Sequence, residues 1–325
     1  MPTMQNAHID RALTNISVAY LQDASAFIAD KVFPIVPVKR QSDVFYIYNK
    51  GDFMRDEAQV RGAATESAGG DYGVEASDPY YCRKHAFHKD VTPEERANYD
   101  EPLDADTDAT DFVTQKMLIR REMDWASKFF VPGKWGKEIT GVATGAAENQ
   151  VIQWDQATST PIQDITGAGV AMAGETGYKP NTLVLSPYAF NALKNHEDIL
   201  DRIKYTQKGI VTEDLLATLF EVDRVFVAWS VVNSAKKGAT DAVDFIYGKH
   251  ALLCYSNPRP ALRKPSAGYI FAWTGLEGSG AYGNRIVRLP MDQLGLGTER
   301  IEGEIAFDTK QICKDMGIFF KDIVG

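Results

Sequence analysis

The clearest helical pattern in the chain lies in its first half. Five apolar residues fall on one face of a 3.6-residue repeat: Phe112, Ile119, Met123, Ala126 and Phe130. This spacing predicts a long helix over about 108 to 130. Several aspartates crowd its N-terminal end, where the exposed amides of a first turn favour negative charge. Pro132 and Gly133 end the pattern, since neither residue continues a helix well.

The segment of residues 1 to 40 has no core of its own. It begins with apolar residues at helical spacing: Ile9, Leu13, Ile16 and Tyr20. Further along, Pro34 and Pro37 exclude a helix and predict an extended arm. An extended arm cannot bury its apolar side chains against itself. These side chains therefore need another surface, either on the chain's own core or on another subunit.

Residues 41 to 90 have the pattern of a long two-stranded hairpin. Residues 44 to 48 are all β-branched or aromatic and predict a strand, and an aromatic-rich extended pattern resumes from Tyr80 to His88. Between these strands, glycines and alternating charges leave almost no large apolar residue, which predicts a flexible, charged tip. An isolated hairpin is marginal in water, so this one needs a neighbour to pack against.

Helices and strands alternate from Trp154 onward, which marks a candidate domain boundary near residue 150. Ser186 and Pro187 combine a helix cap with a first-turn proline, and the apolar run of residues 182 to 185 predicts a short buried strand. After Pro258 the chain becomes rich in β-branched and aromatic runs. The whole pattern predicts an α+β fold.

Composition narrows the class of protein. The 325 residues are 44% hydrophobic and 24% charged, which is enough for a sizeable core and two domains. The net charge of -9 argues against binding nucleic acid through a general basic surface. Three scattered cysteines suit a reducing compartment and are interpreted as buried thiols. The first residues lack a secretory pattern and no apolar run is long enough to span a membrane, so we expect synthesis in the cytoplasm.

The sequence offers little catalytic chemistry. Cys82, His85 and His88 bring three side chains of metal-ligating type within seven residues. In a strand, however, residues 82 and 88 face one way and residue 85 the other, and no fourth ligand follows at metal-site spacing. We therefore expect ordinary hairpin side chains there, with a zinc site as the alternative. The glycine-rich residues 278 to 283 precede a strand and not the helix that a dinucleotide site needs. No catalytic residue and no cofactor are predicted.

The order of these parts resembles the major capsid protein of tailed bacteriophages, a family whose fold encapsulin shells share. The resemblance is carried by the stretch from Ala29 to Val38 and the strand at Phe45 to Tyr48, and it extends over essentially the whole chain. It implies a phage major-capsid fold of four parts: an N-terminal arm (1–40), an extended β-hairpin loop (41–92), a peripheral domain with a long spine helix (93–153 and 299–325, the helix at about 108–130) and an axial α/β domain (154–298).

Such a family resemblance implies assembly and not catalysis. Copies of the chain would join into pentamers and hexamers of an icosahedral head that encloses double-stranded DNA without sequence-specific binding. A separate scaffold protein is implied because the chain does not begin with long charged helices, and a portal and decoration proteins are further implied partners. The implied location is the virion capsid, after synthesis and assembly in the cytoplasm of a bacterial host, with no membrane partner.

An assembly function makes the segments without a core the candidates for subunit contact. The apolar anchors and the surrounding charges are Phe33, Ile35, Phe45, Tyr46, Tyr48, Phe53 and Tyr72, with Arg55, Asp56, Glu57 and Arg61. Each of them could instead pack within its own chain. Some relatives cross-link their subunits through a loop lysine. Lys50 is the one lysine between residues 41 and 83, but it lies near the predicted strand, so a solvated side chain is the favoured interpretation.

Three other functions stay open at this point. An encapsulin-type nanocompartment would use the same fold to enclose cargo enzymes. A cytosolic enzyme would use residues 154 to 298 as its α/β domain, with Cys82, His85 and His88 as its metal candidates. A tail or adaptor protein would form rings and not shells.

Overall fold

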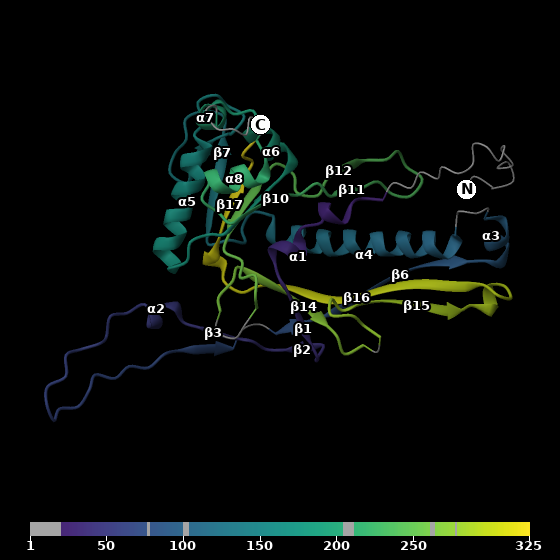
Figure 1. Cartoon of the computed structure of the whole chain (residues 1–325), viewed down its shortest axis with the longest axis horizontal. Helices are drawn as coiled ribbons and strands as arrows, with labels where there is room; N and C mark the ends of the chain where they lie inside the picture. The colour runs from purple at the N-terminus through teal and green to yellow at the C-terminus, as the bar shows by residue number, and fades with distance from the viewer. Residues whose placement is uncertain (1–20, 77–78, 100–103, 204–210, 261–263, 277) are drawn as a thin grey trace.

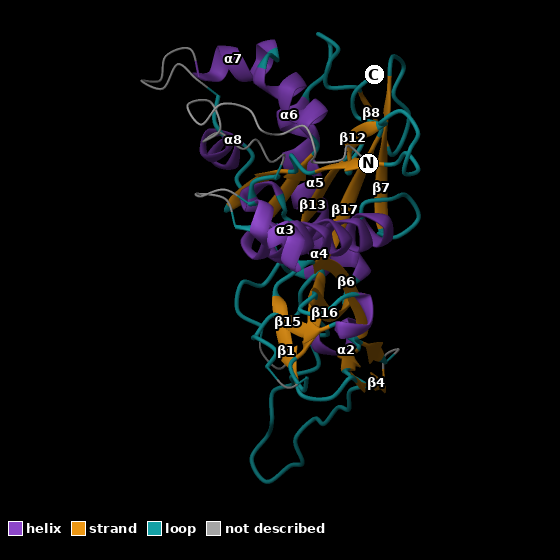
Figure 2. Ribbon diagram, turned by 90° about the vertical axis from the view of Figure 1, so that its right-hand side faces the viewer, coloured by secondary structure: helices purple, strands orange, loops and turns teal. Residues whose placement is uncertain are grey.

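A computed structural model describes residues 21–76, 79–99, 104–203, 211–260, 264–276 and 278–325 (Figure 1). The helical pattern predicted within residues 1 to 20 lies outside these ranges. Two sheets form the framework of the chain, and the long helix α4 (Ala105–Phe129) lies between them (Figures 1 and 2). The predicted α+β fold is confirmed.

The five-stranded sheet is built around one long central strand. Its strands are β1 (Ile35–Val38), β6 (Arg83–Val91), β14 (Gly268–Trp273), β15 (Asn284–Pro290) and β16 (Glu299–Gln311). β6 pairs with one edge of β16, and β14 and β15 pair with its other edge. α4 packs closely on one face, because a Cβ atom on Gly303 of β16 would collide with the Val113 side chain.

The six-stranded sheet carries four helices. In sheet order its strands are β10 (Arg224–Val227), β9 (Thr182–Leu185), β13 (Ala251–Cys254), β17 (Gly317–Lys321), β7 (Lys137–Val142) and β8 (Gln150–Ile152). The helices are α5 (Pro161–Thr176), α6 (Pro187–Lys194), α7 (Glu197–Ile203) and α8 (Glu213–Leu219). Proline stands in the first turn of α5 and α6, and Gly177 ends α5 with a φ of 73°, a conformation that favours glycine. Their apolar faces share one buried core with the sheet.

The remaining elements are shorter. They are α1 (Ala29–Val32), β2 (Ser42–Asp43), β3 (Tyr46–Tyr48), α2 (Lys50–Phe53), β4 (Val74–Ala76), β5 (Tyr80–Tyr81), α3 (Pro93–Asn98), β11 (Val231–Asn233) and β12 (Val243–Phe245), with short 3-10 turns at Ala24–Ala26, Asp292–Leu294 and Lys314–Met316. β11 and β12 form a hairpin that projects from the six-stranded sheet along α4 (Figure 1).

The long helix occurs where the apolar spacing predicts it. α4 begins three residues before the predicted start at 108 and ends at Phe129. The Asp104 carboxylate accepts the backbone N–H of Asp106 at 3.1 Å, so an aspartate caps the helix as its N-terminal charges suggest.

Sheet pairing divides the chain differently from the expected boundaries near 154 and 298. β7, β8 and β17 come from the segments assigned to the peripheral domain, yet they belong to the six-stranded sheet. β14 and β15 come from the segment assigned to the axial domain, yet they belong to the five-stranded sheet. β6 also differs from prediction, since it pairs with β16 over its whole length and does not return along the hairpin. These pairings join strands that are far apart in sequence, and a local sequence pattern cannot predict which distant strands will pair.

Candidate assembly surface

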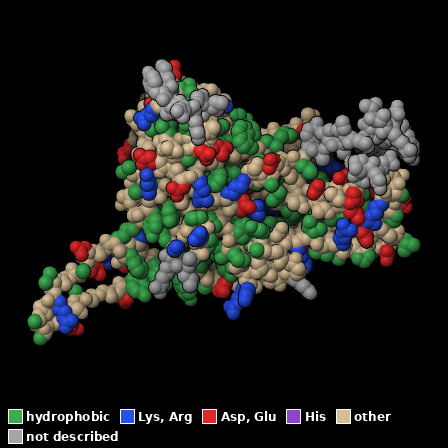
Figure 3. All heavy atoms as spheres, viewed as in Figure 1, with side chains coloured by type: hydrophobic (Ala, Val, Ile, Leu, Met, Phe, Trp, Pro, Cys, Tyr) green, Lys and Arg blue, Asp and Glu red, His purple; other side chains and the backbone are tan. Residues whose placement is uncertain are grey.

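The predicted extended loop is paired only near its root. β2 pairs with β5 and β3 pairs with β4, each over two or three residues. From Met54 to Gly73, all of which are described, the chain contains no helix or strand. This stretch projects away from both sheets as a narrow extension with apolar and charged side chains along it (Figures 1 and 3). We therefore treat residues 50 to 75, of which this stretch is the outer part, as the candidate assembly surface, here called the extended loop.

Three aromatic side chains gather at the base of the extended loop. The ring centroids of Tyr48 and Phe53 are 5.9 Å apart, and those of Phe53 and Tyr72 are 5.4 Å apart. Phe53 is 63% exposed and Tyr72 is 52% exposed, so the rings cover one another without being buried in a core. Tyr46 of β3 is 66% exposed nearby in sequence. Exposed aromatic groups of this kind are typical of binding surfaces.

Charged side chains continue along the extended loop. The Arg55 guanidinium lies 3.3 Å from Asp52 and 3.8 Å from Glu57, and Arg61 donates to the backbone carbonyl of Thr65 at 2.5 Å. Asp56 is exposed beside them. Exposed ion pairs contribute little to stability because water screens them. These ion pairs therefore hold the loop only weakly.

The root of the extended loop is held against the six-stranded body. The Lys50 ammonium lies 2.5 Å from Asp315 and 3.6 Å from Glu175 of α5. The hydrogen bond to Asp315 raises the pKa of Lys50 above its ordinary value. The sequence favours a solvated Lys50, but in the structure its ammonium is paired with carboxylates of its own chain. This arrangement gives no support to a cross-linking role.

The arm residues pack within their own chain. Phe33 is fully buried, with its ring centroid 5.4 Å from that of Trp125 and 5.0 Å from that of Phe129. Ile35 lies in β1, paired with Ile270 of β14, and is half-buried. Phe45 stacks on Phe271 at 5.7 Å. The sequence leaves open whether Phe33 packs against another subunit or within its own chain, and the structure supports packing within its own chain.

The predicted trio of metal-ligating types does not converge. Cys82 is buried, its thiol donates to the carbonyl of Phe271, and burial raises its pKa to about 12. His85 faces α4 and packs on Phe307, with centroids 5.3 Å apart, whereas His88 is exposed on the other face of β6. Within the described ranges, no group of three or more side chains is placed to hold a metal ion. Cys254 is also buried, but Cys313 is half-buried, where the sequence predicts a buried thiol.

A buried carboxylate holds the arm, and sequence reasoning missed it. Glu122 of α4 accepts the backbone N–H groups of Ile28 at 2.9 Å and Ala29 at 3.0 Å, and it also accepts the hydroxyl of Tyr247. Burial raises the pKa of Glu122, although all three donors oppose that effect. Arg121 adds an ion pair of 2.8 Å with Asp30. No local motif marks these residues, because their partners lie about 90 or more positions away.

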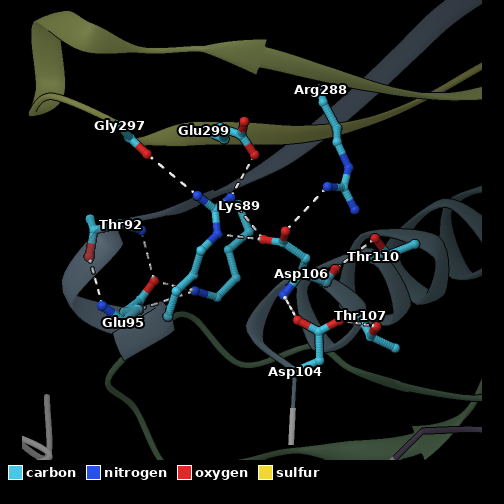
Figure 4. Close-up of polar contacts among 11 residues, drawn as sticks. Lys89, Thr92, Glu95, Asp104, Asp106, Thr107, Thr110, Arg288, Gly297 and Glu299 are labelled. Carbon is cyan, nitrogen blue, oxygen red and sulfur yellow. Dashed lines mark hydrogen bonds and ion pairs between the residues drawn. The ribbon is translucent and has the colours of Figure 1, made fainter. Parts of the chain in front are cut away.

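A second missed cluster fixes the far end of the five-stranded sheet (Figure 4). The Arg96 guanidinium of α3 donates to Asp106 at 2.9 Å and to Glu299 at 2.7 Å. Arg288 of β15 reaches the other oxygen of Asp106 at 3.2 Å. Thr92 and Glu95 form a capping box at the start of α3. The network joins α3, α4, β15 and the start of β16 through side-chain hydrogen bonds.

One serine and histidine pair in the described chain has no catalytic geometry. Ser159 and His196 lie 2.9 Å apart, but the Ser159 hydroxyl donates to the carbonyl of Gln156. Nδ1 of His196 accepts the backbone N–H of Asp198, which favours the tautomer with the proton on Nε2, and in that tautomer Nε2 donates to Ser159 and does not accept its proton. The pair joins two segments and does not activate a nucleophile.

Comparison with known proteins places this architecture. No protein-family model matches the chain. The major capsid protein of Burkholderia phage BcepMu is 26% identical over 252 residues, which cover 76% of each chain. The major capsid protein of Pseudomonas phage JBD67 is 26% identical over an alignment of 333 positions, covering 98% of this chain and 97% of that one. The findings identify a phage-type structural capsid protein.

Solved structures show the fold of this capsid protein independently. A phage-related protein from Bordetella bronchiseptica has 24% identity and a TM-score of 0.70, covering 93% of this chain and 94% of that one. The capsid of cyanophage P-SCSP1u has 10% identity and a TM-score of 0.62, covering 97% and 93%. An encapsulin from Synechococcus elongatus, with 13% identity and a TM-score of 0.55, covers 96% and 93% and shares the fold. Among the described helices of the capsid protein, none has both the length and the apolar character to cross a bilayer.

Proposed function

We propose that this capsid protein assembles into pentamers and hexamers that close the icosahedral head of a tailed phage around double-stranded DNA. The extended loop is the observation that carries the proposal. Its aromatic and charged side chains are exposed, and its stretch from Met54 to Gly73 has no core of its own. When the loop of one subunit contacts a different surface of the next subunit, the contact is head-to-tail. Repeated contacts of this kind form a closed ring if the rotation between neighbouring subunits divides a full turn.

The two sheets support a revised division into domains. We assign the five-stranded sheet with α4 to the peripheral domain and the six-stranded sheet with α5 to α8 to the axial domain. β17 returns the chain to the axial sheet, beside β7 and β13. The N-terminal arm crosses between the two bodies and is held by Glu122. The spine helix of this proposal is α4.

Assembly and not catalysis accounts for the chemistry of the chain. The buried thiols of Cys82 and Cys254 have pKa values of about 12, so they are protonated and unreactive at neutral pH. The proposal includes a separate scaffold protein, a portal and decoration proteins as partners. The DNA is enclosed without sequence-specific contact. The net charge of -9 suits this role because a negatively charged protein does not attract DNA strongly. The protein would be synthesised and assembled in the host cytoplasm and reside in the virion capsid.

Electron microscopy with sedimentation tests the proposal directly. The chain would be expressed alone and then with the neighbouring genes of its source. Closed, faceted particles of hundreds of subunits are the expected result, and DNA inside particles formed in the infected host separates a phage head from an encapsulin, which would hold protein cargo. A monomer or small ring under both conditions contradicts the proposal.

A further inference from the structure

The connection between β13 and β14 lies in a part of the chain that has no carboxylate side chain. All 44 Asp and Glu residues of this acidic protein lie outside residues 245 to 276. Within this range, Arg259 and Lys264 are exposed. Neither of them takes part in an ion pair with any residue that the structure describes. Their positive charges are therefore left for a partner outside the subunit.

Hydrogen bonds join the two ends of this connection. The backbone N–H of Ala267 donates to the carbonyl of Tyr255 at 2.8 Å, and the N–H of Asn257 donates to the hydroxyl of Ser266 at 3.3 Å. Asn257 and Ser266 are both buried, so water does not compete for their hydrogen bond. The two exposed cations therefore extend from an ordered base, and a partner that binds them does not have to order that base first.

A third cation contacts the base of the same connection. Arg224, the first residue of β10, donates to the hydroxyl of Thr182 at 3.1 Å and to the carbonyl of Ser256 at 3.5 Å. Its guanidinium lies 5.7 Å from the ring centroid of Phe226. All of these neighbours are neutral, and Arg224 has no ion-pair partner among the described residues. We call these three side chains the basic surface: Arg224, Arg259 and Lys264.

The surroundings of the basic surface favour DNA over an acidic protein segment. No large apolar side chain described between Tyr247 and Trp273 is exposed. Tyr178 is 38% exposed and lies with its ring centroid 5.0 Å from that of Tyr255, but its phenol is also a donor for phosphate. Protein interfaces bury aromatic and aliphatic anchors, whereas contacts to a DNA backbone need only cations and neutral donors. A duplex backbone is therefore the better match.

We propose that the basic surface faces the inside of the shell and contacts the phosphate backbone of the enclosed DNA duplex. This inference rests on the proposed function and adds which face of the subunit meets the DNA. Contacts to phosphates carry no sequence information, so the inference agrees with enclosure without sequence-specific binding. The net charge of -9 keeps the attraction of the whole subunit for DNA weak, so the contact is local to this surface.

Binding of a short DNA duplex to the full-length, unassembled subunit tests the contact. Fluorescence anisotropy gives the binding constant over a range of salt concentrations. Each phosphate contact adds about 0.9 to the slope of log K against log salt, so Arg259→Gln with Lys264→Gln should reduce that slope by about 1.8 and weaken binding at least tenfold at low salt. The matched control, Lys236→Gln with Lys237→Gln between β11 and β12, removes the same charge from two exposed lysines and should bind like the wild type.

Chemical labelling of closed particles tests the direction in which the basic surface faces. Arg259→Cys places a thiol on the exposed part of the connection, and the reagent is a maleimide joined to a polymer too large to enter the shell. The unassembled variant should be labelled and the closed particle should be protected. The wild-type chain gives the background from its half-buried Cys313. Labelling of intact Arg259→Cys particles at the rate of the free subunit overturns the inference.

Particle formation, followed by sedimentation and electron microscopy, separates the inference from the function on which it rests. The Arg259→Gln, Lys264→Gln chain should form closed particles in normal yield, with thermal unfolding as the check on its fold. Wild-type particles together with unchanged DNA binding by this variant overturn the inference alone. If the variant binds DNA normally but loses binding to the scaffold protein, the basic surface serves a protein partner and the inference is wrong. A wild-type chain that forms no particles contradicts the proposed function itself.

Discussion

The carboxylate of Glu122, in the C-terminal half of α4, accepts the backbone N–H of Ala29 at 3.0 Å across 93 residues of sequence. Its other oxygen accepts the N–H of Ile28 and the hydroxyl of Tyr247. One side chain thus joins the arm, the long helix and the segment before β13. Because Glu122 and Tyr247 are both almost fully buried, none of these donors finds water in place of the carboxylate.

Replacing Glu122 should destabilise the subunit strongly. Glu122→Ala leaves two backbone N–H groups and one hydroxyl without a partner, and each such buried group costs about 1–3 kcal/mol. We expect the free energy of unfolding to fall by about 3 kcal/mol or more, measured by denaturant titration. The control is Glu148→Ala, which removes an exposed carboxylate between β7 and β8 and should change stability by less than about 0.5 kcal/mol. Equal effects of the two changes would contradict the role of Glu122.

Two phenylalanines should separate folding from assembly. Phe33 is buried among Trp125 and Phe129, so Phe33→Ala should lower the free energy of unfolding by about 3–5 kcal/mol. Phe53 is exposed on the extended loop, so Phe53→Ala should change stability by less than about 0.5 kcal/mol and yet reduce particle yield. Thermal unfolding and sedimentation measure the two properties. Normal particle yield from Phe53→Ala would remove Phe53 from the assembly surface.

Deleting the extended loop should abolish shells without unfolding the subunit. Residues 51 to 73 contribute no side chain to the buried core clusters of the described chain, so their removal leaves both sheets intact. We expect a soluble subunit with an unchanged circular dichroism spectrum and no closed particles by electron microscopy. Shells built from the deleted chain would show that the loop is not required for assembly.

Acid should weaken the ion pair between Asp90 and Arg300 in the five-stranded sheet as the pH falls through the pKa of Asp90 in the folded protein. Hydrogen bonds from Arg300 lower the pKa of Asp90 below its ordinary value of 3.8. The ionised carboxylate is therefore favoured in the folded state, so its contribution is present above the ordinary pKa and is lost as pH falls through the folded value. Half-exposed pairs contribute about 1 kcal/mol or less.

The Asp90→Asn variant measures that contribution. At neutral pH it should be less stable than the wild type by this small amount, and below the folded pKa of Asp90 the difference should vanish. Denaturant titration across the acid range gives the comparison. A difference that stays constant with pH would assign the effect to packing and not to charge.

The sequence by itself determined the elements whose causes are local. The apolar spacing of Phe112, Ile119 and Met123 fixes a helix because these residues share one face whatever packs against it, and α4 lies where that spacing predicts it. Glycines and charges between Asn49 and Val74 exclude a core, and the extended loop has none. The family resemblance that these parts support agrees with the curated relatives.

Only the tertiary structure decided which distant segments meet. β6 looked like the return of a hairpin, yet its partner is β16, more than 200 residues later, because an edge of backbone groups pairs with whatever strand the fold brings alongside. The same holds for β17, for the burial of Phe33 and for Glu122 beneath the arm. Hydrogen bonds and apolar contacts require two residues to be close in space, but the residues can be any distance apart in the sequence. Local sequence pattern therefore did not predict the residues that join the two bodies of the subunit.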